Sequence, residues 1–118
     1  MKKINFIVYV KPKSLNNVYP TGRNGRRYLT QEGKDYKEMI AWAALESMNG
    51  QPPFEGKVRV IIHYFHPDLR VDTNNCHKLI LDAIQGVGYN NDRQVWEEHY
   101  FRHLNKINPR LEIIVEEL

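Results

Sequence analysis

The sequence has few of the features that mark several common protein classes. It has one cysteine in 118 residues, Cys76, so an internal disulfide is excluded and a cysteine-rich zinc site is untenable. No apolar run is long enough to span a membrane, and the opening MKKINFIVYVK lacks the small-residue cleavage site of a signal peptide. No repeat or low-complexity tract is present. These absences predict a single globular domain over residues 1–118, in a reducing, cytoplasmic setting and without a membrane partner.

The charge balance is mildly basic. Lys and Arg number 17 against 14 Asp and Glu, which gives a net charge of +3 and a sequence pI near 9.0. This permits a polyanionic partner such as DNA without requiring one. Apolar residues make up 42% and charged residues 26%, as in folded globular proteins.

The hydrophobic pattern predicts an α+β domain with the element order β-α-β-α-β-β and two helices packed on one mixed sheet. Helices are expected from Thr30, as N-cap, to about Met48, and from a cap at Asp72 or Thr73 through an apolar face that includes a buried Cys76. Period-two alternation predicts strands at 4–10, 58–65, 95–104 and 111–116.

The stretch 69–94 carries polar residues at helical spacing. Asn74, Lys78 and Asp82 recur every four residues, Asp72 opens the segment, and Asp92 follows a Gly/Asn-rich break. One interpretation is ordinary: a helix cap, a surface ion pair worth about 0.3–0.5 kcal/mol, and a turn residue. The other is an acidic site, with Glu97 as a candidate neighbour of Asp92. Spacing alone leaves both open.

A second candidate feature is the long segment from 11 to 29, which is rich in Gly, Pro, Asn and Arg and shows no helical or strand period. A loop of this length in a small domain is usually functional or disordered. Its basic side chains suggest contact with phosphates, although a solvated basic surface gives the same pattern. The candidate DNA-contacting residues of this segment are Lys11, Lys13, Arg23, Arg26 and Arg27, and a resemblance to a known family adds Asn17 and Arg70.

These motifs together resemble the RusA family of Holliday junction resolvases. The family signature D-x-D-N-x-x-K-x-x-x-D-A-[LI], followed by D-x-Q-[VI], is matched here from Asp72 to Ile84 and from Asp92 to Val95. Pro12 to Asn16 is similar to the family's P-x-S-x-N segment, and 26–36 resembles its approach to the first helix. The resemblance runs from Lys11 to Tyr100 in the family's order.

The resemblance implies a Mg²⁺-dependent endodeoxyribonuclease, with Mn²⁺ as a substitute, that nicks four-way DNA junctions during recombination and repair. It assigns Asp72, Asn74 and Asp92 as metal ligands and Lys78 as a catalytic cation near the phosphate. It also implies a two-fold homodimer, which matches the symmetry of a junction, and a bacterial or phage-encoded protein associated with the nucleoid.

Two departures from the signature bear on activity. Asn74 stands where the family has a second acid, and Val71 stands where it has a basic residue, with Arg70 one position earlier. An amide oxygen can ligate Mg²⁺ but adds no negative charge, so we expect weakened or absent cleavage. A non-cleaving junction-binding protein and a single-strand binder that stacks bases on Tyr19 and Tyr28 are the alternatives.

Overall fold

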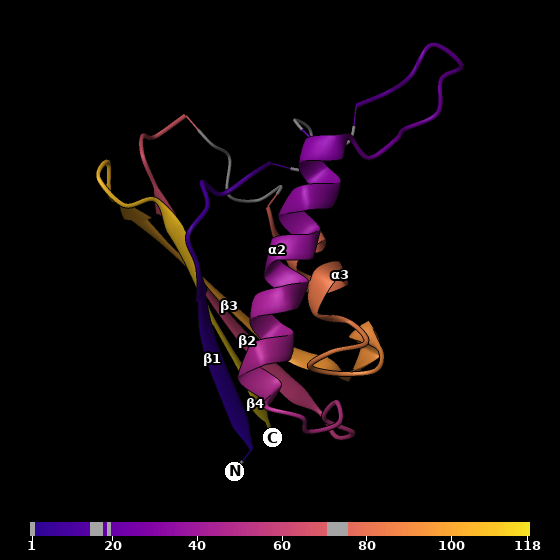
Figure 1. Ribbon diagram of the computed structural model, residues 1–118, viewed down its shortest axis with the longest axis vertical. Coiled ribbons are helices and arrows are strands. Elements are labelled where there is room, and N and C mark those ends of the chain that lie inside the picture. The colour runs from indigo at the N-terminus through magenta and orange to yellow at the C-terminus, as the bar shows by residue number, and fades with distance from the viewer. Residues whose placement is uncertain (1, 15–17, 19, 71–75) are drawn as a thin grey trace.

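The computed structural model describes residues 2–14, 18, 20–70 and 76–118 (Figure 1). In chain order it contains four strands, two helices and one short 3-10 helix. Their bounds are β1 Lys3–Val8, α2 Gln31–Met48, β2 Val58–His66, α3 His77–Ile84, η2 Asp92–Gln94, β3 Val95–Leu104 and β4 Arg110–Glu117.

The strands form one mixed sheet in the order β1-β4-β2-β3. β4 pairs antiparallel with both β1 and β2, whereas β3 pairs parallel with β2. A parallel neighbour requires a crossover connection, and α3 with the turn that follows it supplies one. Figure 1 shows α2 and α3 on the same side of the sheet. The predicted α+β class, the element order and the mixed sheet are therefore confirmed.

The core lies between this sheet and the two helices. Alternate residues of β2 from Val58 to His66 are buried and point toward the helices, as do Ile4, Phe6 and Val8 of β1. Helix α2 contributes a stripe at steps of three and four: Gly33, Tyr36, Ile40, Ala44 and Met48. Cys76 is fully buried, as its apolar neighbours predicted.

Helix α2 has the predicted ends. The Thr30 side chain accepts a hydrogen bond from the Gly33 amide at 3.1 Å, which satisfies one of the free N–H groups of the first turn. Asn49 follows the last turn with φ 51°, and Gly50 with φ 81°, a left-handed exit that stops the helix.

Two predicted boundaries differ from the structure. β1 ends at Val8 instead of Val10, so the chain leaves the sheet before Pro12. Helix α3 begins at His77 instead of near Asp72, and it ends at Ile84 because Gln85 has an extended ψ of 130°. The predicted caps Asp72 and Thr73 lie outside the described residues. Within those residues, no helix is long and apolar enough to cross a membrane.

The predicted loop contains a hairpin-like arm, residues 20–30. Thr21 and Arg27 form an isolated antiparallel bridge, and Gly22 donates its amide N–H to the Arg26 carbonyl at 2.6 Å. Gly25 has φ 79°, the left-handed conformation that this reversal requires. The arm projects beyond the amino end of α2 (Figure 1). Neither face of the arm is covered, so period-two alternation is absent from it and no strand could be predicted there.

Candidate acidic site and basic arm

The connection between α3 and β3, residues 85–94, is anchored by a buried aromatic ring; we call it the Tyr89 turn. Tyr89 is fully buried, and its hydroxyl donates to the Leu81 carbonyl at 2.7 Å. Its own carbonyl accepts from the Gly86 amide at 2.6 Å, and Gly86 has φ 89°. The segment before β2 closes the other side, where the Phe54 amide donates to the Gly88 carbonyl at 2.8 Å. The turn is therefore fixed to both α3 and the entry to β2.

Asp92 is the first residue of η2, at the outer end of this turn. Its amide N–H donates to the Gln85 side-chain oxygen at 3.1 Å, while Asn91 caps the short helix by accepting from the Arg93 amide at 2.9 Å. Asp92 is exposed. Among the described residues, no hydrogen bond or ion pair joins its carboxylate to a partner. Hydrogen bonds therefore hold the Asp92 backbone in place, while its carboxylate is exposed to water.

The Tyr89 hydroxyl is subject to the charges of three acids. Burial raises the pKa of Tyr89, and the negative charges of Asp82, Asp92 and Glu98 raise it further. Lys78 lies 3.6 Å from Asp82, an i,i+4 pair whose side chains are 69% and 35% exposed. At that exposure the pair is worth little by itself. The contact is the i,i+4 surface ion pair of the ordinary interpretation, and a role for Lys78 beside a phosphate stays a prediction.

The predicted ligands Asp72 and Asn74 lie outside the described residues, so their predicted meeting with Asp92 stays a prediction. Asp92 lies beside the carboxyl end of α3, through its bond to Gln85. An eight-residue helix is about 12 Å long, and Asp72 precedes its other end in the chain. In the part of the chain that the structure describes, no three His, Cys, Asp or Glu side chains are placed to hold a metal ion.

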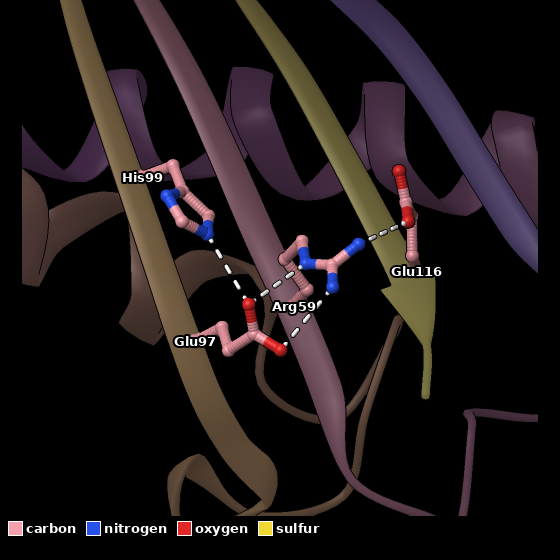
Figure 2. Close-up of polar contacts among 4 residues, drawn as sticks. All are labelled: Arg59, Glu97, His99 and Glu116. Carbon is pink, nitrogen blue, oxygen red and sulfur yellow. Dashed lines mark hydrogen bonds and ion pairs between the residues drawn. The ribbon is translucent and has the colours of Figure 1, made fainter.

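The prediction that Glu97 neighbours Asp92 is wrong. Figure 2 shows Glu97 bound to Arg59, at 3.1 and 3.2 Å, and to His99, while Arg59 also binds Glu116 of β4 at 3.1 Å. The reason is a register shift: Val58 pairs with Val95, but Arg59 pairs with Glu97. The extra residue, Trp96, interrupts the alternation on which the prediction rested. Glu97 therefore faces the side of the sheet away from the helices.

Glu98 faces the helices instead, within a cluster that sequence reasoning missed. It accepts a hydrogen bond from the Tyr100 hydroxyl at 2.7 Å, and the Tyr100 ring stacks on His77 with centroids 3.4 Å apart. His77 Nδ1 lies 2.6 Å from the Tyr64 hydroxyl. Burial lowers the pKa of His77, and Glu98 opposes that shift. This cluster packs the first turn of α3 against β2 and β3, so the helix that carries Lys78 is firmly seated.

Of the predicted DNA-contacting residues outside the arm, Lys13 contacts the first turn of α2. Lys13 forms an ion pair with Glu32, and this hydrogen bond and charge hold the pKa of Glu32 below its usual range. Lys13 is thus partly engaged within the chain, whereas the Lys11 side chain is exposed. Lys11 also contributes to lowering the pKa of Asp68, behind the main cause, the hydrogen bond from the Arg70 amide. The structure therefore brings Lys11 close to the turn that contains Arg70.

Arg70 is 89% exposed and only 3.5 Å from Asp68. Arg23, Arg26 and Arg27 are exposed along the arm, and the Tyr28 ring is 52% exposed. Asn17 and Tyr19 lie outside the described residues. The predicted DNA-contacting residues that the structure describes therefore form two groups: Arg23, Arg26 and Arg27 on the arm, and Lys11, Lys13 and Arg70 outside it.

This geometry defines a class of protein: a small α+β domain with an exposed acid, Asp92, in the Tyr89 turn and exposed arginines on a separate arm. The family model of endodeoxyribonuclease RusA matches residues 10–116, nearly the whole chain. The protein therefore belongs to the RusA endodeoxyribonuclease family, as its motifs predicted. No curated protein matches the chain.

Proposed function

We propose that this protein is a metal-dependent endodeoxyribonuclease that resolves four-way DNA junctions in the cytoplasm, during recombination or repair, with its activity weakened by Asn74. The observation that carries this proposal is the family match over residues 10–116. The exposed Asp92 carboxylate and the Lys78–Asp82 pair of α3 are the parts of the described structure that suit such chemistry.

The exposed carboxylate of Asp92 has the donor chemistry that a hard divalent cation requires. Mg²⁺ prefers carboxylate oxygens and keeps several waters, so it suits an open surface better than a closed cage. Asp92 offers a water-exposed carboxylate with further acids nearby. The remaining ligands in this proposal are Asp72 and Asn74. When bound, the ion supplies an activated water and offsets the charge that builds on the phosphate.

The roles of the chain's own residues follow from charge and position. Asp92 is a ligand of the cation. Lys78, which lies beside Asp82, offers a positive point charge to a phosphate oxygen. Arg23, Arg26 and their neighbours on the arm bind the DNA backbone without reading its sequence. Cleavage then depends on the acids, whereas binding depends on the arm, so the two can be separated by mutation.

A homodimer is part of this proposal, because paired nicks on opposed strands need two sites. A groove of about 550 Å³ between β1 and α2 suggests where a partner surface lies. Trp42, 60% exposed, and Met39, 43% exposed, line it, and exposed apolar surface of this kind marks interaction sites. Analytical ultracentrifugation tests the assembly: a mass of one chain, with and without a junction, contradicts it.

The second candidate function is a junction-binding protein that no longer cuts. The observation in its favour is Asn74, which removes one negative charge from the predicted ligand set. This function needs the arm but no metal. It predicts salt-sensitive junction binding that Mg²⁺ does not change.

The Asn74→Asp variant decides between the two. If the chain is a weakened nuclease, restoring the carboxylate raises the rate of Mg²⁺-dependent junction cleavage by at least about tenfold, equivalent to about 1.4 kcal/mol of transition-state stabilisation. The measurement is symmetric nicking of a synthetic four-way junction across a Mg²⁺ titration. Asn108→Asp, in the turn before β4, adds the same charge elsewhere and is the control. A bound but uncut junction with Asn74→Asp leaves the binding protein as the function.

A further inference from the structure

The short helix that carries Asp92 has little to hold it in place by itself. η2 has three residues and none of them is buried. A 3-10 turn of this length has poor hydrogen-bond geometry and depends on its surroundings. A metal ligand nevertheless has to be placed to within about half an ångström to act well. Something other than η2 must therefore fix the Asp92 backbone.

The Gln94 side chain meets that requirement with four hydrogen bonds. Its oxygen accepts from the amides of Asn90 at 2.8 Å and Asn91 at 2.9 Å. Its nitrogen donates to the carbonyls of Phe54 at 2.6 Å and Gly56 at 2.9 Å. A primary amide has two N–H donors and an oxygen that accepts two bonds. Every hydrogen-bonding position of this side chain is therefore used.

These bonds join two distant parts of the chain. Asn90 and Asn91 directly precede Asp92, whereas Phe54 and Gly56 lie about forty residues earlier, before β2. The Gln85 side chain adds a bond to the Asp92 amide from the end of α3. The backbone on both sides of Asp92 is thus tied to the body of the protein, while its carboxylate stays exposed.

No other common side chain can make the same set of bonds. Glutamate has the same length but only acceptor oxygens, and it would face two carbonyl oxygens at the places where Gln94 donates. Methionine has nearly the same size and shape but forms none of the four bonds. These two variants separate the hydrogen bonds of Gln94 from its volume.

We infer that Gln94 is a positioning residue for Asp92: its side-chain amide fixes the backbone of residues 90–92 so that the Asp92 carboxylate is set for cation binding. The inference rests on the proposed function, in which Asp92 is a metal ligand. Gln94 touches neither the cation nor the DNA, and it acts only through the place that it gives to Asp92.

The test measures Mn²⁺ binding to the full-length protein by isothermal titration calorimetry, together with the Mg²⁺ concentration for half-maximal junction cleavage in the Asn74→Asp background. Gln94→Met is expected to weaken Mn²⁺ binding at least tenfold and to raise that Mg²⁺ concentration by a similar factor. Junction binding in EDTA is expected to stay unchanged, because the arm is intact. Gln51→Met, at an exposed glutamine outside the turn, is the control and is expected to change nothing.

A double-mutant cycle with Asp92→Asn separates positioning from a general structural role. If Gln94 acts through Asp92, Gln94→Met has no further effect on Mn²⁺ affinity once Asp92 has lost its charge. An equal loss in both backgrounds overturns the inference. Should Gln94→Met fail to fold, as judged by its melting temperature in EDTA, Gln85→Met removes the other side-chain bond to this backbone and carries the same expectation.

The outcomes distinguish this inference from the proposed function. If Asn74→Asp cuts junctions while Gln94→Met binds Mn²⁺ as tightly as the unmodified chain, the inference falls and the function stands. If no variant cuts but Gln94→Met still weakens Mn²⁺ binding through Asp92, the function falls and the positioning role stands. Absence of Mn²⁺ binding in every variant, including Asn74→Asp, overturns both.

Discussion

The arm and the Tyr89 turn are both surface connections that carry predicted site residues, yet they are held in opposite ways. Beyond its base, where Thr30 bonds to Val18, the arm's backbone bonds join its own residues, such as Gly22 to Arg26, and its arginines are exposed. The Tyr89 turn bonds to α3 and to the segment before β2, and it buries an aromatic ring. The arm is attached to the rest of the protein only at its base, whereas the Tyr89 turn is attached along its length.

This difference corresponds to the two tasks that we propose. Attraction between a guanidinium and a phosphate falls slowly with distance, so a basic arm can act without a fixed position. Metal–oxygen distances must be correct to about 0.2 Å, so a ligand needs a rigid backbone. In the function that we propose, DNA binding and DNA cleavage therefore lie on two connections that are held in different ways.

The largest effect is expected for the anchor of the Tyr89 turn. Tyr89→Ala removes a fully buried ring and its hydrogen bond to Leu81, and we expect a loss of about 3–5 kcal/mol in the free energy of unfolding. Urea denaturation measures it. Tyr9→Ala, at a tyrosine that is 66% exposed, is the control and should cost less than about 0.5 kcal/mol. Similar losses for the two variants would contradict the account of the turn as buried and anchored.

A smaller effect is expected at the base of the arm. A Cβ atom on Gly33 would lie 2.6 Å from Leu29 Cδ1 and 2.9 Å from Val18 Cβ. At an open helical site, Gly→Ala stabilises by roughly 0.5–1 kcal/mol. Here we expect Gly33→Ala to destabilise the protein by about 1–3 kcal/mol, since the arm base must move away from α2.

Urea denaturation measures the effect of Gly33→Ala, and hydrogen exchange of the Thr30 amide, which donates to the Val18 carbonyl at 2.8 Å, reports whether the base has shifted. Lys34→Ala, at the exposed next position, is the comparison variant. A stabilised Gly33→Ala protein would show that the base of the arm is as loosely attached as its tip.

The smallest effect on stability is expected at the tip of the arm. Arg23→Ala combined with Arg26→Ala should change the free energy of unfolding by less than about 0.5 kcal/mol, because both side chains are exposed. The same pair should weaken junction binding and make the slope of log K against log salt shallower by about 1.8, if each arginine neutralises one phosphate. Binding titrations at several salt concentrations measure it. Lys106→Ala, in the turn before β4, should leave the slope unchanged, and an unchanged slope for the arginine pair would remove the arm from the DNA interface.

The sequence predicted those parts of the fold that depend on local patterns. Alternation located the strands, and Thr30 and Asn49 gave both ends of α2, because caps act on residues within one turn. The start of α3 could not be found, since the polar segment before His77 has capping residues at several positions. The arm was missed because a hairpin with two exposed faces has no alternation.

The candidate site was predictable where it follows helical spacing and not where it depends on long-range contacts. The Lys78–Asp82 pair and the exposed Asp92 were found from spacing and motif. The four bonds of Gln94 were not, because two of its partners lie about forty residues away and are backbone carbonyls, which leave no mark in the sequence. Glu98 was also missed, because the register shift at Arg59 exchanges its side of the sheet with that of Glu97.

That register shift makes β3 a strand whose orientation is decided by a single surplus amino acid. Side chains alternate with a period of two, so removing Trp96 would rotate every following residue of the strand by half a turn. His99 and Phe101 would then be forced under the helices, while Tyr100 would be turned out into water and away from His77. Most side chains of this edge strand are exposed, yet its length before Glu97 cannot change without removing Tyr100 from His77.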